Sequence, residues 1–241
     1  MGEERFYRKI MIRRGLVSFR VVHKETDLHI QARQDLTSKV SEWVLESRLA
    51  IEHYGTRHPR FFDSLVPLPN DEIAPPVVKE MLEAAAAAGV GPMASVAGVI
   101  AGYVGQKIVE TIGGEVVVEN GGDIFLKVSG QAEAAVWAGE SPFSGKIAIR
   151  FDTKGEPRGL CTSSGTVGHS LSMGASDAVT VLCESPSIAD ALATAGGNMV
   201  SRRGDVKRAL EFLQAHSACL AALVISGDKL GIFGDLELVE L

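Results

Sequence analysis

The chain has 241 residues, of which 46% are hydrophobic and 22% are charged, and its formal net charge is −6. This composition excludes a disordered or collagen-like chain, and the acidic balance disfavours non-specific nucleic-acid binding, which needs a basic surface. Cys161, Cys183 and Cys219 stand far apart in the sequence without a CxxC pair. We therefore expect small core residues there, and neither a disulfide framework nor a zinc site.

Two segments bear on targeting. Residues 1–14 are charged throughout, which predicts that no signal peptide is present. The longest uncharged run, residues 84–106, is long enough to cross a bilayer, but it consists mainly of Ala and Gly and is broken by Gly89, Gly91 and Pro92. We therefore expect a buried helix of small residues, no membrane partner and a cytoplasmic location.

Hydrophobic periodicity predicts the elements in chain order. The first half is predicted to hold a strand hairpin within residues 17–32 and helices over 36–54, 76–88 and 93–112. Short strands are predicted over 116–118, 124–126, 134–136, 147–151, 160–162 and 179–182, followed by helices from 187 and over 205–215. Strands 220–225, 230–233 and 236–239 are predicted to close the chain as a meander. Mixed blocks of this kind favour the α+β class, with mixed, largely antiparallel sheets packed with helices, in one domain over 1–241.

Three glycines lie on or near one face of the predicted helix 93–112. They are Gly98, Gly102 and Gly105. Because glycine has no Cβ, this spacing predicts a face buried against another backbone.

A glycine-rich turn follows that helix. Asn120, Gly121, Gly122 and Asp123 stand between two predicted strands. Asn-Gly is the favoured pair of a type I′ hairpin turn, so a plain turn explains the segment. Alternatively, the two glycines expose backbone N–H groups to a ligand, with Asp123 as a hydrogen-bond acceptor.

The helix that starts near residue 187 contains Asp190 and Thr194, four positions apart and therefore on one face. A carboxylate and a hydroxyl suit Mg²⁺, which takes one or two protein carboxylates together with waters and phosphate oxygens. The alternative is a structural acid near a helix N-terminus, favoured by the helix dipole. We place both side chains on a solvent-facing surface of the helix.

A loop of hydroxyls and glycines follows the strand 160–162. Its candidate ligand contacts are Thr162, Ser163, Ser164, Gly165 and His169. Such a loop can wrap a phosphate with N–H and O–H donors, or it is a solvated turn. The sequence contains no Walker motif, GxSxG elbow or HExxH spacing, so common nucleotide folds, α/β-hydrolases and zinc sites are not supported.

Together these segments resemble the ApbE family, the flavin transferases that move FMN from FAD onto a protein threonine. The family's helix motif Ala-Asp-Ala-Leu-Ala-Thr-Ala matches residues 189–195 at every position, and its Gly-Gly-Asp-Ile turn matches residues 121–124. Its Thr-Ser-Gly loop is similar to residues 162–165, and the similarity spans roughly residues 94–197. The resemblance implies an ApbE-like fold, Mg²⁺ held by Asp190 and Thr194, and a glycine turn that contacts the bound dinucleotide.

The sequence also departs from the family pattern. Where the family has Asp-Leu-Gly-Gly-Ile-Ala-Lys-Gly-Tyr, residues 95–103 place Ser95 at the aspartate and Ala101 at the lysine. The family's His-Ile-x-Asp-Pro loop is reduced to residues 169–173, with neither Asp nor Pro. Residues 1–75 show no family pattern, whereas 76–241 carry the motifs.

Two classes of function therefore stay open. The first is an Mg²⁺-dependent enzyme acting on FAD or a related diphosphate, either as a flavin transferase with a protein acceptor or as an FAD pyrophosphatase. The second is a non-catalytic ligand-binding or interaction protein on the same scaffold. The expected partners are a small diphosphate ligand, a protein acceptor and further copies of the chain, and not nucleic acid.

Overall fold

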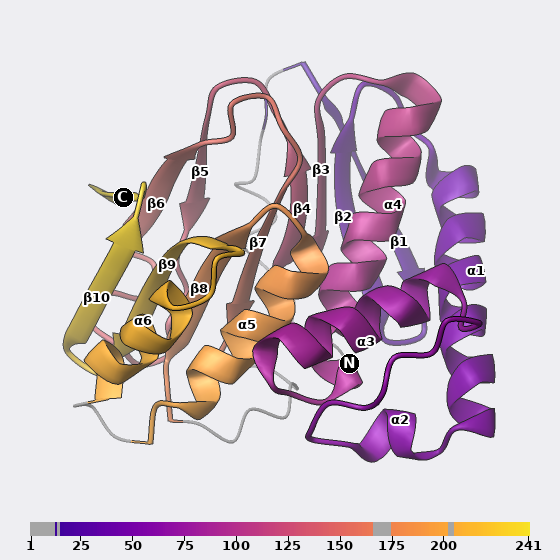
Figure 1. Cartoon of the computed structure of the whole chain (residues 1–241). Coiled ribbons are helices and arrows are strands. Elements are labelled where there is room, and N and C mark those ends of the chain that lie inside the picture. The colour runs from indigo at the N-terminus through magenta and orange to yellow at the C-terminus, as the bar shows by residue number, and fades with distance from the viewer. Residues whose placement is uncertain (1–12, 14, 166–174, 202–204) are drawn as a thin grey trace.

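The computed structural model describes residue 13 and residues 15–165, 175–201 and 205–241. A large antiparallel sheet forms its centre, with the strands in the order β1-β2-β3-β4-β7-β8-β9-β10. Figure 1 shows the helices α3, α4, α5 and α6 in front of this sheet. The strands are β1 (Val17–His23), β2 (Thr26–Ala32), β3 (Val116–Asn120), β4 (Asp123–Lys127), β7 (Arg158–Ser163), β8 (Ala178–Cys183), β9 (Cys219–Ser226) and β10 (Lys229–Gly234).

A second sheet of three strands has the order β11-β6-β5. Its strands are β5 (Gln131–Ala135), β6 (Ile147–Asp152) and β11 (Glu237–Glu240). The predicted C-terminal meander is therefore wrong at its last strand. β9 and β10 do form a hairpin, but β11 pairs with β6 of the smaller sheet, where Leu238 lies opposite Ile149. The alternation within residues 236–239 predicts a strand, but it cannot identify the strand's partner.

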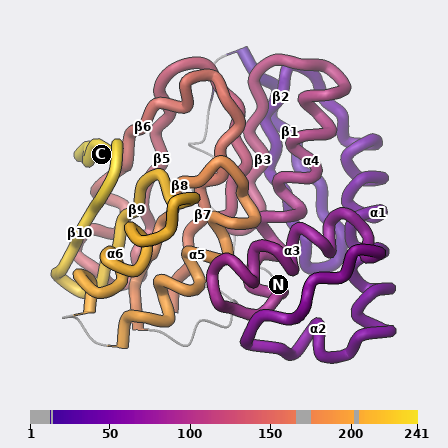
Figure 2. Tube along the Cα trace, viewed as in Figure 1, coloured from indigo at the N-terminus to yellow at the C-terminus, as the bar shows by residue number. Residues whose placement is uncertain are grey.

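The helices are α1 (Thr37–Arg57), α2 (Arg60–Asp63), α3 (Pro76–Ala88), α4 (Val96–Ile112), α5 (Pro186–Asn198) and α6 (Val206–Gln214), with a 3₁₀ turn, η2 (Pro92–Ser95), before α4. Figure 2 follows the chain from α3 through the sharp bend into α4. In the described part of the chain, no single helix is long and apolar enough to span a membrane. α3 and η2–α4 meet that criterion of length and composition only as a pair bent by 103°.

Three buried clusters hold these layers together. The first packs α1, α3 and α4 against β1–β4, and includes Leu28, Ile30 and Ile108. The second packs α5 and α6 against β7–β9. The third lies between the main and the smaller sheet, where Leu160 and Phe151 are buried. Because successive side chains of a strand point to opposite faces of the sheet, the main sheet contributes apolar side chains to the helices on one face and to the smaller sheet on the other. The α+β prediction, with largely antiparallel sheets packed with helices, is confirmed.

The glycine face of α4 is buried against backbone only at Gly98. A Cβ added there would collide with the carbonyl oxygen of Pro186. Gly105 instead packs against the aromatic ring of Phe125, and half-buried Gly102 leaves room for a Cβ 3.4 Å from the nearest Pro186 side-chain atom. The expectation of a continuous backbone contact is therefore wrong for Gly102 and Gly105, because a strand side chain fills the space beside Gly105.

Candidate functional site

The glycine turn joins β3 to β4 as a two-residue hairpin loop. Asn120 pairs with Asp123, and the two residues between them, Gly121 and Gly122, have φ values of 71° and 110°. Positive φ at both central positions is what a type I′ hairpin turn needs, and glycine adopts it without steric cost. The central pair is therefore Gly-Gly, one residue later than the Asn-Gly pair that the sequence favoured.

Buried polar side chains fix this turn. The carboxylate of Glu119, which is 1% exposed, accepts the N–H of Gly122 at 3.0 Å. The amide of Asn120 donates to the carbonyl oxygen of Ala97 at 3.1 Å, so the turn is tied to the first turn of α4. Glu119 therefore accepts the Gly122 N–H, which disagrees with the alternative in which both glycine N–H groups face a ligand.

Asp190 lies inside the protein, contrary to the expectation of a solvent-facing position. It is 8% exposed, and its Oδ2 accepts the backbone N–H of Gly98 at 2.8 Å. The helix motif therefore contacts the same first turn of α4 that holds Asn120. Thr194, one turn further along α5, is half-buried.

α4 begins without a cap of its own, which explains the Asp190 contact. The hydroxyl of Ser95, at the N-cap position, donates to the carbonyl of Pro92 at 3.0 Å instead of accepting from α4. The first N–H groups of a helix need acceptors from elsewhere, and the positive end of the helix dipole favours a carboxylate there. Asp190 supplies this acceptor from α5.

The carboxylates of Asp190 and Asp123 interact electrostatically near the first turn of α4. Burial, followed by the charge of Asp123, raises the pKa of Asp190 well above its usual range, and the N–H groups of Gly98 and Ala97 oppose that shift. Asp123 is itself 8% exposed and lies opposite Cys161 in the β4–β7 pairing. Burial and the charges of Asp123 and Asp190 likewise raise the pKa of the Cys161 thiol. The glycine turn and the helix motif thus converge on one buried, electronegative centre.

One side chain of the hydroxyl loop lies on the same face of the sheet as Cys161 of this centre. Ser163 follows Cys161 by two residues on β7, so both face α5, and the buried Ser163 Oγ has no hydrogen-bond partner among the described residues. Thr162 points to the opposite face of the sheet, where its hydroxyl lies 2.9 Å from that of Thr180.

Beyond β7 the loop is described only at its ends. The N–H of Gly165 donates to the carbonyl of Ser176 at 2.9 Å. Ser164 is half-buried. The predicted contact at His169 lies outside the described residues.

The donor set at this centre suits a hard cation. The described residues hold no group of three or more His, Cys, Asp and Glu side chains arranged for a metal. The carboxylates of Asp190 and Asp123 are oxygen ligands of the kind that Mg²⁺ takes from a protein when phosphate oxygens and water complete its shell, and Thr194 offers a hydroxyl one turn along α5 from Asp190. A cation would also offset the buried negative charge that raises the pKa of Asp190. The residues present therefore fit Mg²⁺.

A separate pocket of about 180 Å³ lies between α1 and the connection into α3. Its lining includes His53, Arg57, His58 and Asp71, none of which belongs to the acidic centre. The Tyr54 hydroxyl donates to Asp71 at 3.1 Å, and the Tyr54 and His58 rings stack with centroids 4.2 Å apart. These contacts fix the end of α1.

Several groups of the acidic centre were not predicted from the sequence. They are the side chains of Glu119 and Cys161 and the N–H groups of Ala97 and Gly98. The one signal in the sequence was Ser95, which stands where the ApbE pattern has aspartate and so leaves the start of α4 without an acidic side chain of its own.

Comparison with known proteins identifies the family. A family model described as "AbpE bacteria" matches residues 8–225. The UPF0280 protein MK0206 of Methanopyrus kandleri is 41% identical over 228 residues, which cover 91% of each chain. The UPF0280 protein MJ1526 of Methanocaldococcus jannaschii is 36% identical over 229 residues, which cover 92% of each chain.

Solved structures share the fold at low sequence identity. The flavinyl transferase ApbE of Pseudomonas stutzeri, in its apo form, superposes with a TM-score of 0.59 at 12% identity, over 90% of this chain and 93% of that one. The ApbE protein of Thermotoga maritima gives a TM-score of 0.57 at 14% identity, over 90% and 96% of the two chains. On the family match and on the relatives, which align over 91–92% of each chain, the chain belongs to the ApbE-like family, in the group that includes the UPF0280 proteins.

Proposed function

We propose that this protein binds FAD, or a closely related diphosphate, together with Mg²⁺, and transfers FMN to a protein acceptor. The observation that carries the proposal is the convergence of the Gly-Gly-Asp turn and the helix motif on the first turn of α4, through Asn120 and Asp190. A structural neighbour named as a flavinyl transferase supports the choice of reaction.

Each group has a specific role in this proposal. Asp190 and Thr194 hold Mg²⁺, which when bound would neutralise the diphosphate charge beside the bond that breaks. The start of α4 adds the positive end of its dipole to the same place. Asn120 holds the turn against α4, Glu119 fixes the turn by accepting from Gly122, and the buried hydroxyl of Ser163 would donate to a ligand oxygen.

The products distinguish the two reactions that this site could perform. In transfer, an acceptor hydroxyl attacks the FMN phosphorus, the P–O–P bridge breaks, AMP leaves and the hydroxyl proton passes to solvent. In hydrolysis, water is the nucleophile and free FMN appears with AMP. Mass spectrometry of the protein fraction and chromatography of the nucleotides therefore separate flavinylated acceptor from free FMN.

One structural observation favours the alternative of binding without turnover. Ala101 stands where the ApbE pattern has lysine, and it is fully buried with no charge to offer a ligand. A protein that binds FAD with Mg²⁺ but releases no AMP, with or without an acceptor, would be a binding protein on this scaffold. The cytoplasmic location and self-association stay predictions.

The experiment is an incubation of purified protein with FAD and Mg²⁺, with an EDTA control and an Asp190→Asn variant. The proposal expects Mg²⁺-dependent release of AMP by the wild type and a large loss in the variant. AMP release that is equal in EDTA, or unchanged by Asp190→Asn, contradicts the assigned metal site.

A further inference from the structure

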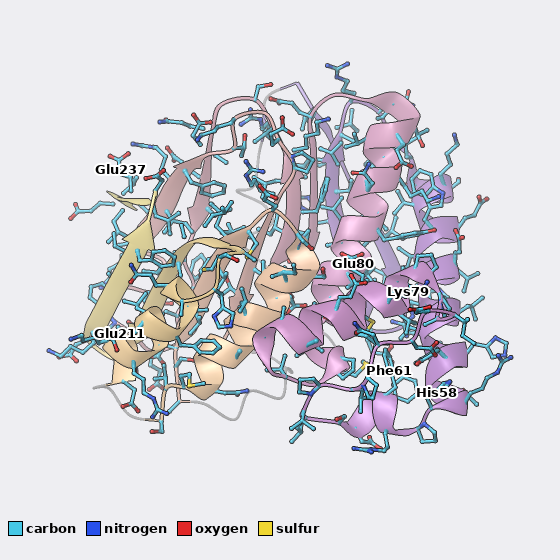
Figure 3. The ribbon with its side chains drawn as sticks, in the orientation of Figure 1. His58, Phe61, Lys79, Glu80, Glu211 and Glu237 are labelled. Carbon is cyan, nitrogen blue, oxygen red and sulfur yellow. The ribbon has the colours of Figure 1, made fainter. Side chains whose placement is uncertain are left out.

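A half-buried carboxylate outside the acidic centre contacts the beginning of α5. Glu80, on α3, accepts a hydrogen bond from the Ser187 hydroxyl at 2.8 Å, and the Ser187 and Ser185 hydroxyls are 2.6 Å apart. Figure 3 labels Glu80 where α3 passes the first turn of α5. Ser185 is the N-cap residue of α5, so this cluster forms at the start of the helix that carries Asp190.

The hydrogen bond between Ser187 and Glu80 is shielded from water. Ser187 is 1% exposed, and burial raises the pKa of Glu80, whereas the hydrogen bond from Ser187 opposes the shift. A carboxylate removed from water is costly unless hydrogen bonds compensate it. Glu80 therefore depends on the position of the Ser187 hydroxyl, and the first turn of α5 is fixed by Glu80 in return.

The same turn is held from two other elements. The Cys161 thiol, on β7, donates to the Pro186 carbonyl at 3.3 Å, and Gly98 of α4 packs directly against that carbonyl. β7, α4 and α3 therefore constrain the first turn of α5 from three directions, and Glu80 is the α3 contribution.

This turn determines where Asp190 lies. Ser187 precedes Asp190 by three residues, so the two side chains are on neighbouring parts of one helix face. Asp190 must bring its Oδ2 within 2.8 Å of the Gly98 N–H, and a shift of the helix start of a few tenths of an ångström lengthens that bond.

We propose that Glu80 is a positioning residue, which holds Asp190 against the start of α4 through Ser187. The consequence for metal binding rests on the function proposed above. The placement of Asp190 against Gly98 does not, so it can be measured without any ligand.

The test uses Glu80→Ala, Glu80→Gln and Ser187→Ala in the full chain, with Glu83→Ala as the matched control. Glu83 is an exposed glutamate one turn further along α3; its charge adds to the rise in the pKa of Glu80, but burial is the larger cause of that rise. The first readout is hydrogen exchange of the Gly98 amide, normalised to amides in β8. We expect faster exchange in Glu80→Ala and Ser187→Ala, and wild-type exchange in Glu83→Ala and in Glu80→Gln, whose side-chain carbonyl still accepts from Ser187.

The second readout is the Kd for FAD in Mg²⁺ and in EDTA. Glu80→Ala should weaken binding about tenfold in Mg²⁺ only, the factor expected when one hydrogen bond to a charged group is lost. A wild type that binds no FAD in Mg²⁺ refutes the proposed function and leaves the Gly98 measurement to decide the role of Glu80. Unchanged Gly98 exchange in Glu80→Ala and Ser187→Ala overturns the positioning role, and so does exchange that rises equally across all amides.

Discussion

The backbone N–H of Gly98 donates to Asp190 Oδ2 at 2.8 Å, so a side chain 92 residues further along the chain caps α4. This contact joins two segments that the sequence presents separately, the glycine-rich helix and the Ala-Asp-Ala-Leu-Ala-Thr-Ala motif. It also gives Asp190 a structural role beside the proposed metal role. Substitutions at either residue therefore act on both stability and binding, and the experiments must separate the two effects.

Gly98→Ala should destabilise the protein although alanine favours helices. An added Cβ would collide with the Pro186 carbonyl and lie 2.8 Å from the Asp190 Cβ. Overpacking of this kind costs about 1–3 kcal/mol, more than the roughly 1 kcal/mol that alanine gains over glycine in a helix. Urea denaturation measures the difference. Gly102→Ala is the control, because its Cβ meets Pro186 only at 3.4 Å, and it should be neutral or stabilising. Equal stabilities for the two variants would count against the close packing at Gly98.

Asp190→Asn should change how stability depends on pH in the absence of metal. Because burial and Asp123 raise the pKa of Asp190, the native state binds this proton more tightly than the unfolded state. The contribution to stability is complete below the ordinary aspartate pKa of about 3.9 and is lost as the pH rises through the raised value. Asparagine has no proton to lose, so the free energy of unfolding of the variant should rise relative to that of the wild type as the pH increases above about 4. Unfolding free energies in EDTA across this range test it, and parallel profiles would refute it.

The cysteine thiols should be unreactive in the native protein. Cys161, Cys183 and Cys219 are free and buried. The hydrogen bond with Cys219, and then burial, raises the pKa of Cys183, which lies opposite Cys219 in the β8–β9 pairing. Because the thiolate is the reactive form, a thiol reagent such as DTNB at pH 8 should label them slowly before denaturation and completely after it. Rapid labelling of one thiol in the folded protein is the contrary result.

Local pattern was enough to predict most elements of the fold. The prediction of a helix over residues 76–88 agrees with α3, and the strand prediction over 179–182 lies within β8, because hydrophobic periodicity and proline or glycine boundaries are local signals. The four-residue α2 was not predicted, since one helical turn has no periodicity to detect. Strand partners depend on contacts between distant segments, which is why the place of β11 was not foreseen.

The candidate site was predictable only in its residue types. The helix motif identified Asp190 and the glycine turn identified Asp123, but the burial of both follows from the packing of α5 against α4, β4 and β7, which neither local pattern reveals. Thr162 and Ser163 were predicted together as loop contacts. Both lie on β7, where strand alternation sends their side chains to opposite faces of the sheet. The role of Glu80 could not be predicted from the sequence, because it depends on a hydrogen bond from Ser187, which lies 107 positions later.

The most direct test of the account is a calorimetric titration of FAD into wild type, Asp190→Asn and Thr194→Val, each in Mg²⁺ and in EDTA. The account predicts that wild type binds much more tightly in Mg²⁺, and that both variants lose this gain. Asp190→Asn should lose more, because a charged ligand attracts the cation more strongly than a hydroxyl does. Wild-type binding that is equally tight in EDTA, or a full Mg²⁺ effect in Asp190→Asn, would contradict it.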